Sequence, residues 1–335
     1  MTFRHDAKRM PGTTATALLV FLTAPVAAQD GVFEGSTAVP GVKPMVSGRM
    51  TVVEKSPLSR EIELVYLDAA TGRQVPDFDV ELTQELHILA VDEQLHELVH
   101  EHVREAQPDG RFAAELQFPH SGTYHIYTDA VPSGYGQQVL RFDVPVGADE
   151  AGQASPAIDV TMGPISSSAG DYTVELDATH LRAGKEGVMA LRVTRNGQPA
   201  TDLAPYLGVA AHVVLIGADD LAYVHAHALA DDSMHEEMDH GGHAVEGMDH
   251  STGHDSHHMA EEPMPAMEHD GHLGGHAHGA GDDAHQAIMG VPGTVPAELS
   301  VYVTPPAPGE YGLWIEFVGE DQVVTVPFRI EVPAG

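Results

Sequence analysis

The chain beyond residue 47 consists largely of short stretches in which apolar and polar residues alternate, separated by glycine, proline and asparagine. Alternation with a period of two places every second side chain on the same face of an extended strand. Helical periodicity is scarce, and many short strands at this spacing are typical of antiparallel sandwiches. The pattern predicts an all-β protein of two tandem immunoglobulin-like antiparallel β-sandwiches, with strands that include residues 61–67, 139–144, 188–194 and 326–332.

A histidine pattern with the spacing H-x12-H-x-H occurs once in each half of the chain, at His87, His100 and His102 and again at His212, His225 and His227. Each copy continues into a Gly-x-Tyr strand, which begins at Gly122 in the first and Gly309 in the second. The shared order predicts two related domains, 48–146 and 158–333, joined by a polar linker at 147–157.

The N-terminal segment has the features of a secretory signal peptide. Three basic residues precede an apolar run at 15–22, and small residues follow up to Ala28. We therefore expect 1–28 to be removed and the mature chain to be periplasmic or secreted, with no membrane span left after cleavage. Residues 29–47 are rich in glycine, proline and serine, and predict a flexible leader.

The second copy is longer than the first between its histidine pair and its Gly-x-Tyr strand. Twenty residues separate His102 from Gly122, whereas 82 separate His227 from Gly309, which indicates an insertion of about 62 residues. Residues 232–290 contain 12 His, 7 Met and 13 Asp or Glu, without any Lys, Arg or aromatic residue. Such a segment cannot bury enough apolar surface to order itself, so we expect a disordered loop between two strands.

The composition of 232–290 favours metal binding. Imidazole suits Cu(II), zinc and nickel, whereas thioether sulfur is useful chiefly for Cu(I), so the mixture favours copper, with zinc or nickel as alternatives. The alternative to metal binding is that the segment is only a solvated polar spacer whose composition has drifted. The candidate ligands are Met234, His235, Met238, His240, His243, Met248, His250, His254, His257, His258, Met259, His269, His272, His276, His278 and His285.

The six histidines of the repeated pattern are candidates for two folded metal sites. His100 and His102 point the same way in a strand, as do His225 and His227, and a gap of twelve residues suits a strand, a turn and a return. Three imidazoles converging on one sheet face would make an open site suited to copper or zinc. Half-buried histidines that satisfy hydrogen bonds are the alternative. Carboxylates available to orient the ligands are Asp92, Glu97, Glu101, Asp219 and Asp220.

Charge and cysteine content exclude several classes of protein. The formal net charge of −34 would be repelled by phosphate backbones, so nucleic acid is not an expected partner. The chain has no cysteine, which excludes disulfides, iron–sulfur clusters and a blue-copper centre.

The chain combines a histidine on one strand, a later H-x-H pair, a Gly-x-Tyr strand and, before His212, the segment Pro205-Tyr206-Leu207-Gly208. This combination resembles bacterial secreted proteins with tandem immunoglobulin-like, YtkA-like modules. Many of those proteins have a proline after the H-x-H pair, where this chain has Val103 and Ala228. The Met-Asp-His sequences of 232–290 resemble the metal-rich segments of periplasmic copper-resistance proteins. This second resemblance implies copper handling in the cell envelope.

The leading interpretation is a periplasmic metal-binding protein that sequesters copper, confers resistance to it or delivers it, with metal ions and another periplasmic metal-handling protein as candidate partners. We do not expect an enzyme, because the sequence shows no evident nucleophile, G-x-S-x-G elbow or cofactor fingerprint. Two alternatives stay open: a metalloenzyme with an open three-histidine site, and a β-sandwich module that binds a protein partner.

Overall fold

The computed structural model describes residues 30–40, 43–147, 164–230 and 293–335, and all regular elements in these ranges are strands. The all-β prediction is therefore confirmed. Among the described residues no helix is long and apolar enough to cross a membrane. The predicted signal peptide, nearly all of the predicted linker and the 232–290 insertion lie outside the described residues, as do the methionine and histidine ligands predicted there.

The first half of the chain forms two antiparallel sheets that pack on a common core of buried side chains such as Met50, Leu64, Ile88 and Phe142. One sheet has the order β1 (Gly31–Glu34), β3 (Val46–Ser56), β4 (Ser59–Asp68) and β8 (Phe112–Gln117). The other has the order β2 (Ser36–Thr37), β10 (Gln138–Val146), β9 (Gly122–Pro132), β6 (Leu86–Asp92) and β7 (Leu98–Val103), and β5 (Phe78–Asp79) pairs with β9.

The second half has the same strand order. Its strands β11 (Ile165–Ala169), β12 (Tyr172–Asp177), β13 (Gly187–Arg195) and β18 (Glu298–Val303) correspond to β1, β3, β4 and β8. Strands β20 (Gln322–Val332), β19 (Gly309–Gly319), β16 (Ala211–Gly217) and β17 (Tyr223–Ala230) correspond to β10, β9, β6 and β7. Short strands β14 (Gln198–Pro199) and β15 (Leu203–Ala204) pair with β13 and β19. Here β17 also pairs with β18, so the two layers join along one edge.

The four stretches predicted as strands lie within β4, β10, β13 and β20, as the alternation indicated. The prediction of a flexible leader at 29–47 is wrong. Strand β1 pairs with β3 over four residues, β2 pairs with β10, and Ala38 is buried. The reason is that short edge strands draw their stability from the sheet they join, so their own turn-rich composition does not reveal them.

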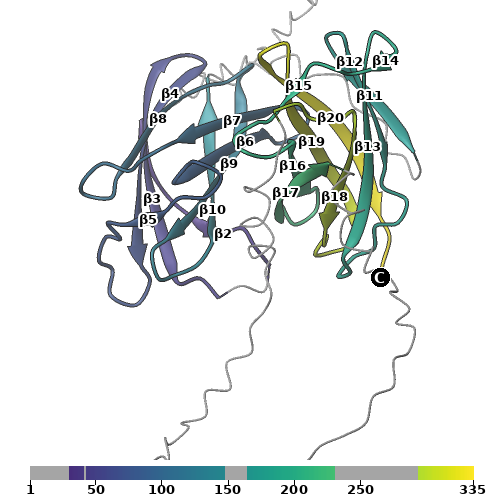
Figure 1. Ribbon diagram of the computed structural model, residues 1–335. Helices are drawn as coiled ribbons and strands as arrows, with labels where there is room; N and C mark the ends of the chain where they lie inside the picture. The colour runs from purple at the N-terminus through teal and green to yellow at the C-terminus, as the bar shows by residue number, and fades with distance from the viewer. Residues whose placement is uncertain (1–29, 41–42, 148–163, 231–292) are drawn as a thin grey trace, which may run out of the picture.

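Strands β6 and β16 are buried on both faces. Along β6, Ile88 and Ala90 point into the core of the first half, whereas Leu89 and Val91 belong to a separate apolar cluster that also contains residues of the second half. We call this set the interdomain cluster; its fully buried members are Ala38, Leu89, Val91, Leu95, Tyr127, Val139, Val214, Ile216, Tyr223 and Trp314. Tyr127 and Tyr223 stack across it with ring centroids 5.3 Å apart. The two halves therefore pack side by side through the outer faces of β6 and β9 and of β16, β17 and β19 (Figure 1).

Candidate metal centre

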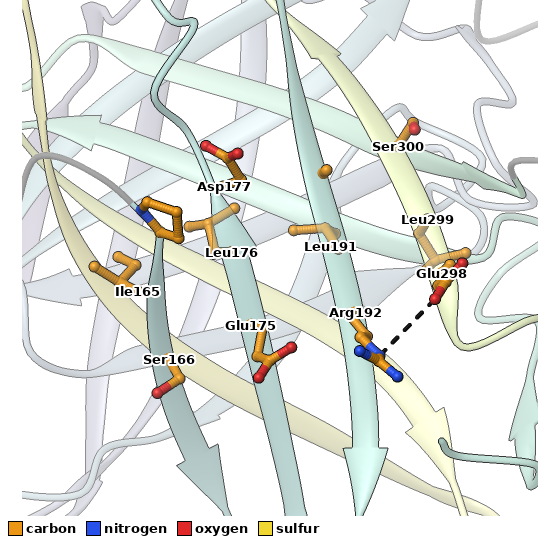
Figure 2. A pocket seen from close by; sticks show the side chains of 12 residues that line it. Ile165, Ser166, Glu175, Leu176, Asp177, Leu191, Arg192, Glu298, Leu299 and Ser300 are labelled. Carbon is orange, nitrogen blue, oxygen red and sulfur yellow. Dashed lines mark ion pairs between the residues drawn. The ribbon is translucent and has the colours of Figure 1, made fainter. Parts of the chain in front are cut away.

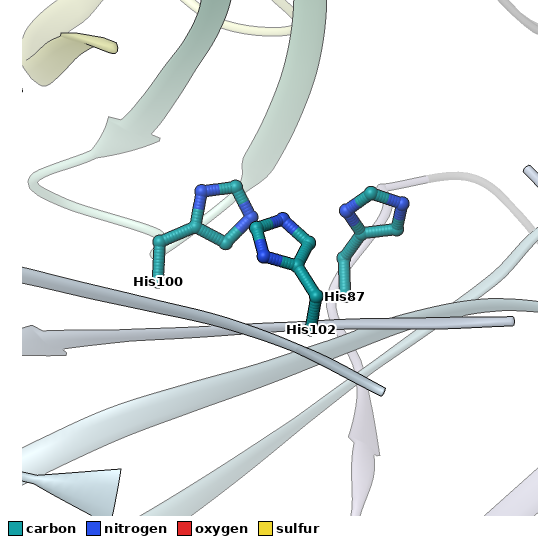
Figure 3. Close-up of side chains that lie close together, drawn as sticks. All are labelled: His87, His100 and His102. Carbon is teal, nitrogen blue, oxygen red and sulfur yellow. The ribbon is translucent and has the colours of Figure 1, made fainter. Parts of the chain in front are cut away.

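Each hairpin that carries the H-x12-H-x-H pattern places its three histidines on one face. His87 on β6 lies directly opposite His102 on β7, and His212 on β16 lies directly opposite His227 on β17. The middle histidine of each set, His100 or His225, stands two residues earlier on the returning strand and shares the face. Within each set of three, one ring nitrogen per histidine lies within 4.8 Å of the others. Figure 3 shows the first set, with all three rings turned to the same side.

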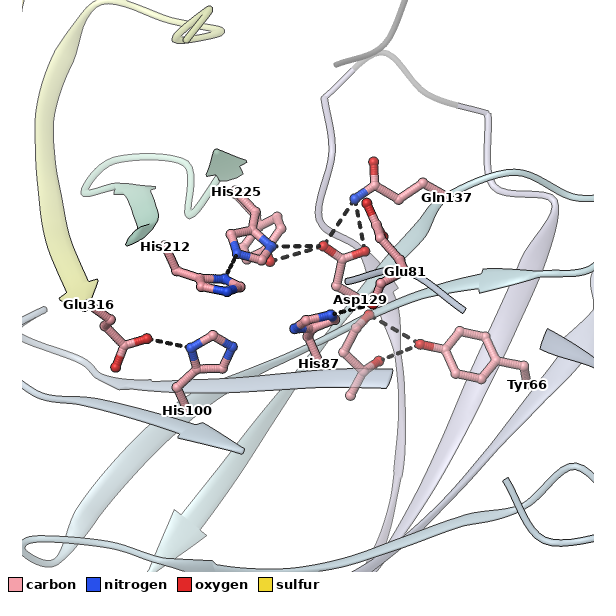
Figure 4. Close-up of polar contacts among 11 residues, drawn as sticks. Tyr66, Glu81, His87, His100, Asp129, Gln137, His212, His225 and Glu316 are labelled. Atoms are coloured by element: carbon pink, nitrogen blue, oxygen red, sulfur yellow. Dashed lines mark hydrogen bonds and ion pairs between the residues drawn. The ribbon is translucent and has the colours of Figure 1, made fainter. Parts of the chain in front are cut away.

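The two sets of histidines, hereafter the first and second triads, face each other across the domain interface. The ring centroid of His87 lies 5.6 Å from that of His225, and the centroid of His100 lies 5.7 Å from that of His212. The centroids of His102 and His212 are 6.3 Å apart. The structure thus brings six imidazoles into one cluster, which Figure 4 shows in part (His87, His100, His212 and His225).

Several ring nitrogens in the cluster are buried and have no hydrogen-bond partner. They are His87 Nδ1, His100 Nε2, His102 Nε2, His212 Nε2 and His227 Nε2. The other nitrogen of His87 donates to the carbonyl oxygen of Glu81 at 3.3 Å, and His212 Nδ1 shares a hydrogen bond of 3.0 Å with His225 Nε2. A buried polar atom without a partner costs about 1–3 kcal/mol, so five such nitrogens in one place require an explanation.

Burial also keeps five of the six imidazoles neutral. Together with the smaller effect of neighbouring histidines, it lowers the pKa of His87, His225 and His227 to about 3 and that of His102 to about 2. The pKa of His212 is lowered in the same way and for the same reasons. A neutral imidazole is the form that coordinates a metal ion, so these five histidines could bind one without first losing a proton.

Two buried carboxylates border the cluster. Asp129 on β9 lies directly opposite His87, and Glu316 on β19 lies directly opposite His212, so the two acids occupy corresponding positions. Asp129 accepts hydrogen bonds from Gln137 Nε2 and from the Tyr223 hydroxyl, each at 3.0 Å. Glu316 Oε1 accepts from the Thr325 hydroxyl at 2.8 Å.

A family model described as "Domain of unknown function (DUF8832)" matches residues 38–148 and 167–252, which is more than half of the chain. The chain belongs to the DUF8832 family. The matched segments contain all six histidines of the triads together with Asp129, whereas Glu316 lies beyond them.

No curated protein matches this DUF8832 chain. Among solved structures, the chain is similar to the crystal structure of domains 4 and 5 of the S-layer protein SbsC, with 11% sequence identity. The comparison covers 91% of this chain and 98% of the other, with a TM-score of 0.18.

The carboxylates that the sequence suggested as ligand-orienting groups lie elsewhere in the DUF8832 chain. Asp92 Oδ1 accepts the backbone N–H groups of His96 and Glu97 at 2.7 and 2.9 Å, where β6 ends. Glu101 lies between His100 and His102 on β7 and therefore points to the opposite face of the strand. Asp219 and Asp220 lie in the turn between β16 and β17, where Asp220 accepts the N–H of Ala222.

Sequence reasoning missed Asp129 and Glu316, although a signal was present. Each acid lies five residues after the tyrosine of the Gly-x-Tyr strand, Tyr124 in the first half and Tyr311 in the second, and each interrupts an apolar strand. A charged residue at the same offset in both copies, inside a strand expected to be buried, indicates a role in a polar site.

An open depression on the second half lies apart from this site (Figure 2). It is lined by residues of β11, β12, β13 and β18, and Arg192 Nε lies 3.8 Å from Glu298 Oε1 at its rim. None of these strands carries a triad histidine, so among the described residues the chemistry that suits a metal ion is concentrated between the two halves of this DUF8832 chain.

Proposed function

We propose that the protein binds transition-metal ions, most favourably copper, through the two triads and the His- and Met-rich segment 232–290, and that it sequesters or delivers them in the cell envelope. The observation that carries this proposal is the group of five buried imidazole nitrogens without partners, gathered in two triads. Three imidazoles with an open coordination position suit copper or zinc, and a bound ion would give these nitrogens the partner that they lack.

The choice of copper rests on the sequence outside the described residues. Segment 232–290 alternates histidine with methionine, and thioether sulfur adds affinity chiefly for Cu(I). The segment would capture ions through many exchangeable ligands, and the triads would hold them in fixed geometry. The predicted signal peptide at 1–28 places this activity in a periplasm or outside the cell, where copper is met before it enters the cytoplasm.

The test is the metal content of the mature protein, purified without a histidine tag, exposed to a copper salt and freed of loosely bound ions by gel filtration. We expect several copper equivalents in the wild type, and fewer but not zero after deletion of 232–290. In that deleted background, replacement of His87, His100 and His102 by alanine should remove the ions of the first triad. Replacement of His212, His225 and His227 should do the same for the second.

The matched control is the double variant H125A/H180A, which removes two histidines outside the triads and should keep the metal content of the deletion protein. His125 Nδ1 is paired with Asp143, and His180 is exposed, so neither contributes to the cluster. Unchanged copper content in both triad variants, with far-ultraviolet circular dichroism showing folded protein, would refute the assignment of the triads. Unchanged content after the 232–290 deletion would refute the contribution of that segment.

A further inference from the structure

The ion pairs of the two buried carboxylates cross the interface between the domains. Glu316, which belongs to the second half, accepts a hydrogen bond from Nδ1 of His100 in the first half. Asp129, which belongs to the first half, has its Oδ2 atom 3.7 Å from Nδ1 of His225 in the second half. His100 and His225 are the middle histidines of their triads. The buried carboxylate of each domain therefore lies beside the middle histidine of the other domain's triad (Figure 4).

The orientation of His100 is the one that metal-binding histidines adopt. Its Nδ1 is held by the carboxylate of Glu316, while its Nε2 is buried without a partner and lies among the other rings of the first triad. A carboxylate that takes the N–H of one ring nitrogen fixes the tautomer and the ring orientation, and leaves the other nitrogen free to bind a metal ion. Because this carboxylate comes from the second half, the first triad is oriented only when the two domains are packed together.

Charge gives a second, independent indication. Asp129 is 1% exposed and Glu316 is 3% exposed. In the ion pairs of the described residues, Asp129 pairs only with His225 and Glu316 pairs only with His100. A buried carboxylate is stabilised by a nearby positive charge, and two cations held between the triads would supply it.

We propose that the two triads form one binuclear metal centre between the domains, in which Glu316 orients the ligands of the first triad and Asp129 orients those of the second. This inference rests on the proposed metal-binding function and adds to it a ligand arrangement that crosses the interface. The ligand class is a pair of transition-metal cations, one at each triad.

A crossed comparison in the full-length protein tests the arrangement. One background, H212A/H225A/H227A, keeps only the first triad, and the other, H87A/H100A/H102A, keeps only the second. Each background receives either Glu316→Gln or Asp129→Asn, which remove charge with little change of shape. Copper bound to 232–290 is common to all of these proteins and cancels in the comparison.

Trp314 reports ions at the triads in a Cu(II) chloride titration, because Cu(II) quenches nearby indole fluorescence and the chain has a single tryptophan. Strand β16 lies between β19 and β17, and its residue Val214 is paired with Trp314 on β19 and with His225 on β17. Two strand spacings put the backbones of Trp314 and His225 about 10 Å apart. Trp314 is also two residues from Glu316 on the same strand, so the first triad is near it as well.

With the first triad alone, Glu316→Gln should weaken Cu(II) binding about 10–100-fold, while Asp129→Asn should change it far less. With the second triad alone the effects should be exchanged. Should a triple-alanine background fail to fold, the single replacements H102A and H227A, one in each triad, give the same crossed comparison with less disturbance.

Larger effects of each acid on the triad of its own domain, or no effect of either acid, would overturn the inference while leaving the proposed function intact. If removal of each triad leaves both the quenching and the bound copper of the full-length chain unchanged, the part of the proposed function assigned to the triads fails, and the inference fails with it.

Discussion

Replacing Leu89 by alanine should weaken the contact between the domains while leaving each domain folded. Leu89 is fully buried, but it points away from the core of the first half and into the interdomain cluster. Truncation of a buried leucine to alanine costs about 2–5 kcal/mol, made up of lost transfer free energy and the cavity left behind. When the domains separate, residue 89 becomes exposed to water whichever side chain it carries, so this cost applies to the interface and hardly to the fold of the domain.

Urea titration with two probes measures this separation. Trp314, the single tryptophan of the chain, is 1% exposed within the interdomain cluster, so its emission moves to longer wavelength when the domains part. Far-ultraviolet circular dichroism follows the strands of both domains. With a urea m-value of about 2 kcal/mol/M, a loss of about 2–5 kcal/mol lowers the midpoint of the Trp314 transition by about 1–2.5 M. The circular dichroism midpoint should change much less.

The neighbouring residue provides the matched control. Ile88 is similar in size and equally buried, but it points into the core of the first half. Ile88→Ala should therefore lower the circular dichroism midpoint of that domain. The reasoning is refuted if Leu89→Ala and Ile88→Ala shift both probes equally, because the interface and the domain would then be one cooperative unit.

Two further predictions concern the polar part of the interface. Tyr223→Phe removes one of the hydrogen bonds to the buried carboxylate of Asp129 and should cost about 1–3 kcal/mol, measured as a lower thermal midpoint; an unchanged midpoint would contradict the role given to that hydroxyl. The metal-free protein should lose stability as the pH falls from about 7 to 4. The pKa of His87, His225 and His227 is about 3 in the folded protein against an ordinary value of 6.5, so within this window the unfolded chain binds more protons. Two carboxyl groups act in the opposite direction: burial and Asp129 raise the pKa of Glu81 to about 7, and burial raises the pKa of Asp129. Urea midpoints across this pH range test the sign, and stability that rises on acidification would show it to be wrong.

The hairpin geometry of the triads could be predicted because it is local. Strand alternation and a twelve-residue gap are enough to place His87 opposite His102 and His212 opposite His227, and the register agrees. The strands of the leader could not be predicted from its composition, because β1 and β2 depend on pairing with strands far away in the sequence. The location of 232–290 between two strands is consistent with β17 and β18 on either side of it.

The meeting of the two triads could not be predicted from either copy alone, because it depends on how two domains pack. A partial signal lies in the residues around His87 and His212. The sequences Leu-His-Ile-Leu-Ala-Val on β6 and Ala-His-Val-Val-Leu-Ile on β16 are continuously apolar except for the histidine, which indicates strands covered on both faces. The first face is covered by the core of the strand's own domain. The second face requires another layer, and the other copy supplies it.

The same alternation links metal binding to domain packing. On β6, His87, Leu89 and Val91 share one face, and on β16 the corresponding residues are His212, Val214 and Ile216. Burying the apolar residues of these faces against each other therefore brings the histidines together, since they lie only two residues away on the same strands. An ion that binds the closed arrangement more tightly than the open one must stabilise closure by the same free energy. Under the proposed function the apolar cluster therefore helps to set the affinity of the triads for an ion. A variant such as Leu89→Ala, which touches no histidine, should then weaken metal binding in proportion to its effect on the interface.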